Sequence, residues 1–182
     1  YRLRKTMVEL KKYLTIRCEE SFGKPLQYQW LGRFDQQENT KFHLDNAGNQ
    51  SFLMLGYEPT KIESELVIAD YVKFSFDQNI NPNQFFDKFN PIFVPCENTL
   101  KSYITSVTPF NNKSFKIVLI NNSNSKNDCE TFGVLHKAKI KKIDLNQRRI
   151  VNSMMLEMEL EKNNIDQNQV EMEFLNTNNN SK

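Results

Sequence analysis

Hydrophobic positions near the start of the chain recur at the spacing of an α-helix. Apolar side chains lie three or four positions apart, with charged residues between them, at Leu3, Met7, Leu10 and Leu14. This pattern predicts an amphipathic helix over about residues 2–20. Gly23 and Pro25 follow, and both are typical of residues that end a helix.

From about residue 28 the pattern changes to short stretches rich in aromatic and β-branched residues, separated by turn-forming residues. In the second half, strands are expected at residues 102–108, 115–121, 132–140 and 149–160. Asn81 and Pro82 form a helix start, and three phenylalanines follow on one helical stripe, which predicts one short additional helix over about residues 82–89. Many short strands with few helices predict a mainly β protein, a sandwich or barrel with helices on its outside.

A chain of 182 residues lies within the usual size of one domain, and no linker-like segment divides it. We therefore expect a single domain over residues 1–160, with the N-terminal helix first and a β core at about 28–160. Residues 161–182 are rich in Asn, Gln and Glu, which predicts a polar, flexible C-terminal tail that is disordered from Asn176 onward.

Composition and charge argue against several functions. A formal net charge of +2 is too small to predict a nucleic-acid partner, and the lysines at 137–142 alternate with apolar residues as on a solvated strand face. No apolar run approaches the ~18 to 20 residues that cross a bilayer. The three cysteines are far apart, odd in number and without metal-ligand spacing, so neither a disulfide framework nor a zinc site is expected, and a reducing compartment is favoured. We therefore expect a cytoplasmic protein without nucleic-acid or membrane partners, and the sequence leaves its oligomeric state open.

The two histidines of the chain provide the candidate chemistry. His43 precedes Asp45 by two positions in a stretch with strand character, so both side chains are expected on the same side of a sheet. His136 lies 93 residues after His43, and Arg149 lies 13 residues after His136. The order is therefore His-x-Asp, a long gap, a second histidine and a basic residue.

This set of residue types suits one kind of metal chemistry. Two neutral imidazoles and one carboxylate on one face of a six-coordinate iron(II) ion leave three positions open, as in non-haem iron oxygenases. Two open positions can take an α-keto acid, and the third can take dioxygen. The distal carboxylate of the keto acid then needs a buried cation, and Arg149 is placed to supply a guanidinium.

These motifs resemble the double-stranded β-helix oxygenases that use iron(II) and 2-oxoglutarate. Members carry His-x-Asp or His-x-Glu near the start of a jelly roll, a distal His in a Gly-x-x-His-like strand, and a basic residue shortly afterwards. The matching residues here are His43-Leu44-Asp45, Gly133-Val134-Leu135-His136 and Arg149, and the resemblance covers about residues 28–160. The segments 33–35, 55–60 and 149–153 also look like an uncharacterised bacterial group near this superfamily.

The resemblance implies a double-stranded β-helix with iron(II) bound by His43, Asp45 and His136, and with 2-oxoglutarate bound by Arg149. One position departs from the family pattern. Many members have Ser two positions after the basic residue, whereas this chain has Val there and its nearest serine is Ser153. Because the separation is even, Ser153 shares a strand face with Arg149, and we expect both to contact the keto acid. The neighbouring Arg148 is the alternative, on the opposite face.

The resemblance also implies a dioxygenase that hydroxylates a C–H bond of a small molecule or a peptide side chain and releases succinate and CO2. Two other interpretations stay open. In a cupin-type β-barrel the same ligands bind a different metal, the keto-acid pocket is absent and Arg149 faces solvent. In a metal-free interaction module, His43 and His136 lie far apart.

Other polar residues are weaker candidates. Tyr57 and Tyr71 could hydrogen-bond the keto acid, although buried tyrosines commonly need only a partner for their hydroxyl group. Asn121 and Asn122 could line the mouth of the site, although asparagines in turns need no function. Arg33 could reach a substrate anion, although a surface ion pair is the ordinary role.

Overall fold

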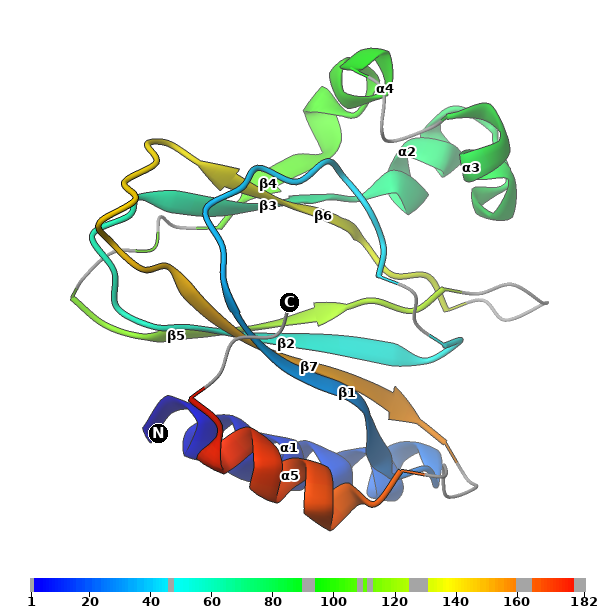
Figure 1. Ribbon diagram of the computed structural model, residues 1–182. Coiled ribbons are helices and arrows are strands. Elements are labelled where there is room, and N and C mark those ends of the chain that lie inside the picture. Colours follow the sequence, from blue (N-terminus) through cyan, green and yellow to red (C-terminus); the bar gives the residue numbers. More distant parts are fainter. Residues whose placement is uncertain are drawn as a thin grey trace.

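The structure is a computed structural model that describes residues 2–45, 48–89, 94–107, 110, 113–124, 131–159 and 165–178. Within these residues the protein is mixed α/β, with two antiparallel sheets that face each other and helices on the outer sides (Figure 1). The described helices are α1 (Arg2–Phe22), α2 (Tyr71–Asp77), α3 (Phe85–Lys88), α4 (Val94–Thr99) and α5 (Gln167–Asn176), with 3₁₀-helices η1 (Pro82–Gln84) and η2 (Lys101–Tyr103). The strands are β1 (Leu26–Asp35), β2 (Ser51–Tyr57), β3 (Ser64–Ala69), β4 (Ile104–Ser106), β5 (Lys116–Asn121), β6 (Leu135–Ile140) and β7 (Ile150–Met158).

The four-stranded sheet has the order β1-β7-β2-β5, and its neighbouring strands are antiparallel. Helices α1 and α5 lie side by side on its outer face (Figure 1). The buried stripe of α1 packs there against apolar strand residues and against Phe174 of α5. Gly56 in β2 lets α1 approach closely, because a Cβ atom at this position would lie 2.3 Å from Sδ of Met7.

The three-stranded sheet has the order β4-β3-β6, and residues 40–43 run beside β6 at its edge. The backbone N–H of Thr40 donates to the carbonyl of Ala138 at 3.1 Å, and His43 and His136 exchange both backbone hydrogen bonds, at 3.1 and 3.0 Å. The outer face of this sheet packs against a largely aromatic cluster from α2 and α3, which includes Tyr71, Phe74 and Phe85. Residues 40–43 therefore act as a further edge strand.

A third apolar cluster lies between the two sheets and draws residues from both. Its buried members are Leu53, Tyr57, Leu66, Phe110, Ile120 and Val151. This cluster fills only part of the interior, because a cavity of about 440 Å³ remains beside it. The cavity is the candidate site.

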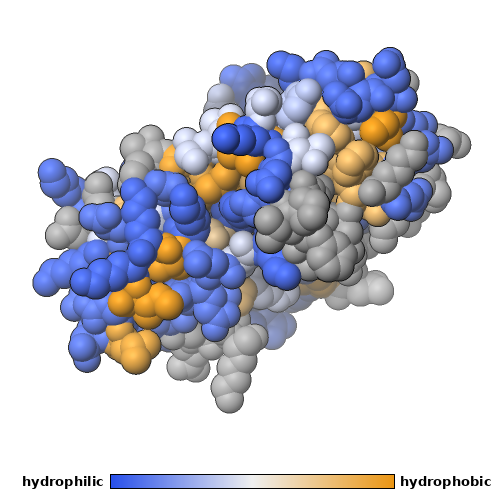
Figure 2. Space-filling model, turned by 90° about the horizontal axis from the view of Figure 1, so that it is seen from above, coloured by the Kyte–Doolittle hydropathy of each residue, from blue (hydrophilic) through white to orange (hydrophobic). Residues whose placement is uncertain are grey.

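The surface seen from above is mostly hydrophilic, and its apolar patches are separate from one another (Figure 2). The exposed large apolar side chains include Phe76 on α2 and Phe86 on α3. None of the helices in the described ranges is long and apolar enough to cross a membrane.

Several sequence predictions about secondary structure are confirmed. The N-terminal helix is present, helical turns follow Pro82, and strands β4 to β7 lie in the four expected segments. The pattern did not predict α2, α4 or α5, so the described part of the protein is mixed α/β where a mainly β protein was expected. Residues 125–130, between the strands expected at 115–121 and 132–140, and residues 179–182, in the expected tail, lie outside the described residues.

The segment 161–182, expected to be a flexible tail, contains helix α5. Asp166 caps this helix, because its carboxylate accepts hydrogen bonds from two backbone N–H groups of the first turn. Val170 and Phe174, four positions apart, pack against the core formed by α1 and the sheet. That apolar surface exists only after the rest of the protein has folded, so the polar composition of the segment was misleading.

Candidate metal centre

The two histidines lie opposite each other on adjacent antiparallel segments. Because His43 and His136 exchange both backbone hydrogen bonds, their side chains leave the sheet on the same face. Their ring centroids are 4.4 Å apart. Strand pairing thus brings together two residues that are far apart in the sequence.

Asp45 completes a group of three possible metal ligands. One carboxylate oxygen lies 3.5 Å from Nε2 of His43, and the other lies 3.8 Å from Nε2 of His136. The three residues each offer one ligand atom within 4.8 Å of the others, so the group could hold a metal ion. Two atoms that bind one ion at about 2.1 Å lie at most about 4.2 Å apart, and each histidine meets this limit with a different oxygen of Asp45.

Protonation at neutral pH also suits a metal ion. Burial and the nearby His43 lower the pKa of His136 to about 4, so its imidazole is neutral and has a lone pair to donate. Burial acts to raise the pKa of Asp45, but a hydrogen bond from His43 and the positive charge that His136 and His43 carry when protonated outweigh it and lower the pKa. A hydrogen bond to Asp45 is the main reason why the pKa of His43 is raised. A metal ion therefore competes with a proton mainly at His43.

The two imidazoles are held differently. Nδ1 of His43 lies 2.7 Å from the carbonyl of Lys41, so it carries a proton in the neutral ring, and Nε2, which faces Asp45, is the nitrogen that takes a second proton or a metal ion. Nδ1 of His136 is buried and has no hydrogen bond of normal geometry among the described residues. The nearby backbone of Val134 contributes only a minor stabilisation of the protonated ring. His136 is therefore oriented chiefly by packing.

Asn122 positions Asp45 through its backbone. The side-chain oxygen of Asn122 accepts a hydrogen bond from the N–H of Asp45 at 3.2 Å, and Asn122 is fully buried. Its own N–H donates to the carbonyl of Ser51 at 3.0 Å, which continues the pairing of β2 and β5 by one residue. The sequence did not predict this role, because the contact spans 77 positions and asparagine is ordinary in a turn.

Arg149 lies in the wall of the same cavity as the three possible ligands. Its side chain is 3% exposed; Nε donates to the hydroxyl of Ser64 at 2.9 Å, and Nη1 donates to the carbonyl of Gln36 at 3.0 Å. The guanidinium carbon lies 5.5 Å from the centre of the Tyr57 ring. In the described part of the chain no carboxylate forms an ion pair with this guanidinium, and burial lowers its pKa. A buried cation without an acidic partner is costly, and it marks a place where an anion would bind favourably.

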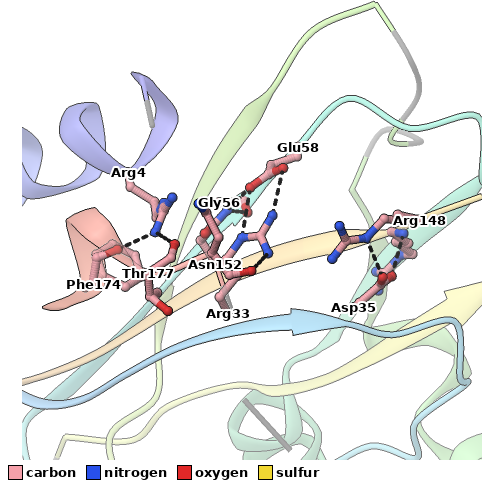
Figure 3. A network of polar contacts seen from close by, with 11 residues as sticks. Arg4, Arg33, Asp35, Gly56, Glu58, Arg148, Asn152, Phe174 and Thr177 are labelled. Carbon is pink, nitrogen blue, oxygen red and sulfur yellow. Dashed lines mark hydrogen bonds and ion pairs between the residues drawn. The ribbon is translucent and has the colours of Figure 1, made fainter. Parts of the chain in front are cut away.

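The alternative, Arg148, points away from the cavity. Its Nε donates to a carboxylate oxygen of Asp35 at 2.7 Å, and its side chain is 60% exposed (Figure 3). The other oxygen of Asp35 accepts the backbone N–H of Arg149 at 3.1 Å, so one carboxylate holds the start of β7 in register. Ser153 also lines the cavity, on the face that Arg149 occupies.

The weaker candidates divide between the two sides of the fold. Tyr57 lines the cavity, and burial raises its pKa to about 12. Tyr71 instead packs among the phenylalanines of the cluster outside the three-stranded sheet. Arg33 lies near α1, in a polar network with Glu58 and Asn152 (Figure 3).

Comparisons with known proteins did not identify a family. No family model, no curated protein and no solved structure matched the chain. Any proposal about function therefore depends on the residues and geometry of the cavity.

Proposed function

We propose that this protein is an iron(II)- and 2-oxoglutarate-dependent oxygenase with a jelly-roll core. The observation that carries the proposal is that two complementary groups line one cavity. These are the possible metal ligands His43, Asp45 and His136, and the buried Arg149. 2-Oxoglutarate requires both, because its keto-acid end chelates a metal and its distal carboxylate needs a cation.

The arrangement of strands supports the jelly-roll core. In the described ranges the two sheets contain seven strands, and residues 40–43 add an eighth segment beside β6. The chain passes repeatedly from one sheet to the other, and the possible ligands face the space between the sheets. These features support a two-sheet jelly roll as the proposed core.

The ligand set fits iron(II). Two imidazole nitrogens and one carboxylate oxygen are the donors of the facial triad, which leaves coordination positions for a keto acid and dioxygen. Affinity does not select iron, since copper, nickel and zinc bind such donors more tightly. Arg149 is what favours iron here, because it provides a place for the distal carboxylate of a keto acid.

When bound, iron and 2-oxoglutarate supply the oxidising chemistry: dioxygen is divided between the succinate formed with CO2 and a C–H bond of the substrate, which becomes a hydroxyl group. The chain itself binds and orients. Ionised Asp45 and neutral His136 are ready to bind the metal, and Arg149 with Ser153 would position the keto acid. The ring of Tyr57 covers the guanidinium, which keeps water from it and strengthens its attraction to a carboxylate.

Two observations favour the oxygenase over the alternatives. A metal-free interaction module predicts distant histidines, whereas the rings of His43 and His136 are 4.4 Å apart. A cupin-type barrel without keto-acid binding predicts that Arg149 faces solvent, whereas its side chain is buried in the cavity wall.

The experiment that tests the proposal is an anaerobic titration of iron(II) and 2-oxoglutarate into metal-free protein, monitored by the visible charge-transfer band of a chelated keto acid. The variants are His136→Ala and Arg149→Ala. Arg148→Ala is the matched control, because it removes the neighbouring guanidinium outside the cavity.

We expect the band to appear in the unmodified protein and in Arg148→Ala. It should be absent in His136→Ala and should require far more 2-oxoglutarate in Arg149→Ala. Metal binding without a band at millimolar 2-oxoglutarate would contradict the proposal and favour the cupin-type alternative.

A further inference from the structure

The cavity extends beyond the possible metal ligands and Arg149 along an apolar wall. On the inner face of the four-stranded sheet this wall contains Trp30, Phe34, Leu53, Leu55 and Met155. Leu66 and Ala138 line it from the three-stranded sheet. The proposed binding of metal and 2-oxoglutarate would use none of these side chains, so they are available to a second ligand.

Two aromatic residues form a shelf on strand β1, at the edge of its sheet. The rings of Trp30 and Phe34 stack with centroids 5.3 Å apart and planes inclined by 25°. Gly32 makes this possible, because a Cβ atom there would lie 2.0 Å from the Trp30 ring. Trp30 is still 40% exposed, so part of its ring surface is uncovered. Flat rings pack favourably on such a surface.

Every charged side chain that lines the cavity in the described ranges already has a proposed role in binding the metal or the keto acid. The described lining residues include charged or ionisable acid–base groups only at His43, Asp45, His136 and Arg149, apart from the hydroxyl of Tyr57. A substrate carboxylate, phosphate or ammonium group beside the shelf would lose water without gaining an opposite charge, which is unfavourable. The shelf therefore suits an uncharged group.

We propose that the substrate is a small molecule with an uncharged aromatic ring that packs on Trp30 and Phe34 while its reacting C–H bond faces the metal ligands. The reaction part of this proposal rests on the proposed oxygenase function, whereas the ring-binding site is inferred from the residues that line the cavity. A cavity of about 440 Å³ is near the lower end of small-molecule sites, which span about 300–1,000 Å³, and bound 2-oxoglutarate would occupy part of it. The remaining space accepts a single small ring system.

The test uses three probes of similar size that differ in charge: benzyl alcohol, benzoate and benzylamine. Each is titrated into the full chain loaded with zinc and 2-oxoglutarate, with zinc in place of iron because it is not redox-active. Trp30 is the single tryptophan of the chain, so tryptophan fluorescence reports directly on the shelf. We expect benzyl alcohol to change the fluorescence and to bind at least about tenfold more tightly than either ion.

A variant tests whether the stacked aromatic pair itself binds the probe. Phe34→Leu keeps the Trp30 reporter, and we expect it to weaken benzyl alcohol binding by about three- to tenfold without changing the affinity for 2-oxoglutarate. Phe76→Leu is the matched control, because Phe76 is 65% exposed on α2 and does not line the cavity. It should leave binding of the probe unchanged.

The two proposals fail in different ways. Equal binding of the three probes, tighter binding of an ion, or no fluorescence change with any probe overturns the ring site, even if 2-oxoglutarate binds. If benzyl alcohol binds selectively and 2-oxoglutarate does not bind in its separate titration, the ring site is supported and the oxygenase proposal is contradicted.

Discussion

Two arginines of this protein are almost fully buried, in opposite surroundings. Arg4 of α1 is 4% exposed, and its Nη1 donates to the carbonyls of Phe174 and Thr177 at 2.5 Å each, at the C-terminal end of α5 (Figure 3). Those carbonyls carry the partial negative charge of a helix end. Arg149 is 3% exposed and has only a hydroxyl and one carbonyl as hydrogen-bond acceptors among the described residues. The fold uses the charge of Arg4, whereas the charge of Arg149 is available to a ligand.

The two faces of the four-stranded sheet differ in the same way. On the side of α1, Nε of Arg33 lies 3.5 Å from a carboxylate oxygen of Glu58, and the amide of Asn152 donates to the same carboxylate at 3.1 Å (Figure 3). On the inner face, Arg149 faces the cavity without such an ion pair in the described ranges, and the ligand group lines the same cavity from the three-stranded sheet. Burial of a charge alone therefore does not mark a functional residue; the informative feature is a buried guanidinium that faces a cavity with neither a carboxylate nor the carbonyls of a helix end beside it.

The largest effect expected is on keto-acid binding. Arg149→Ala should weaken 2-oxoglutarate binding to the metal-loaded protein about 100-fold, because the distal carboxylate loses its charged partner. The free energy of unfolding should fall by less than for a change at Arg4, because the loss of two hydrogen bonds is offset by the removal of a buried charge that has no acidic partner in the described structure. Calorimetric titration and urea unfolding measure the two quantities. Strong destabilisation with unchanged 2-oxoglutarate binding would make Arg149 a structural residue like Arg4.

Arg4→Met should show the opposite behaviour. Loss of the hydrogen bonds to the end of α5 should lower the free energy of unfolding by about 2 kcal/mol. The affinity for 2-oxoglutarate should not change, because Arg4 lies on the other side of the sheet. Urea unfolding is the measurement, with the exposed Arg2→Met as control. A large loss of 2-oxoglutarate affinity in Arg4→Met would contradict the distinction between a structural Arg4 and a ligand-binding Arg149.

Asn122→Ala should weaken metal binding about tenfold, because Asp45 loses the side chain that holds its backbone. Competition with a chelating dye measures the affinity. The control is Asn121→Ala, which removes the same kind of side chain at an exposed neighbouring position. Equal effects of both variants would mean that Asn122 does not position Asp45.

Metal affinity should fall as the pH falls. The pKa of His43 is raised, so a proton competes with the metal there, and each pH unit below that pKa should reduce affinity about tenfold. His136 contributes little to this dependence above its pKa of about 4. Zinc titrations at several pH values measure how metal affinity changes with pH. NMR titration of the chain's two histidines shows which of them causes the change. Affinity that does not change with pH would show that His43 is not a ligand.

The sequence predicted more of the candidate site than of helices α2, α4 and α5. The spacing of His43 from Asp45, and of Arg149 from Ser153, is even, and side chains at even spacing share a face wherever a strand forms. This rule also separated Arg149 from Arg148, and the structure places only Arg149 in the cavity wall. Helix α5 had no comparable signal, because its residues are mostly polar and it forms against a surface built by α1 and β1.

The sequence by itself determined which chemical groups are present and which neighbours share a face, because strand alternation acts over a few residues. Only the tertiary structure decided that residues 40–43 pair with β6 so that His43 meets His136, and that Asn122 reaches Asp45. It also decided that Arg149 has no acidic partner among the described residues, while Arg4 meets the end of a helix. These outcomes depend on contacts between segments many residues apart, and the short-range pattern of a sequence does not encode such contacts.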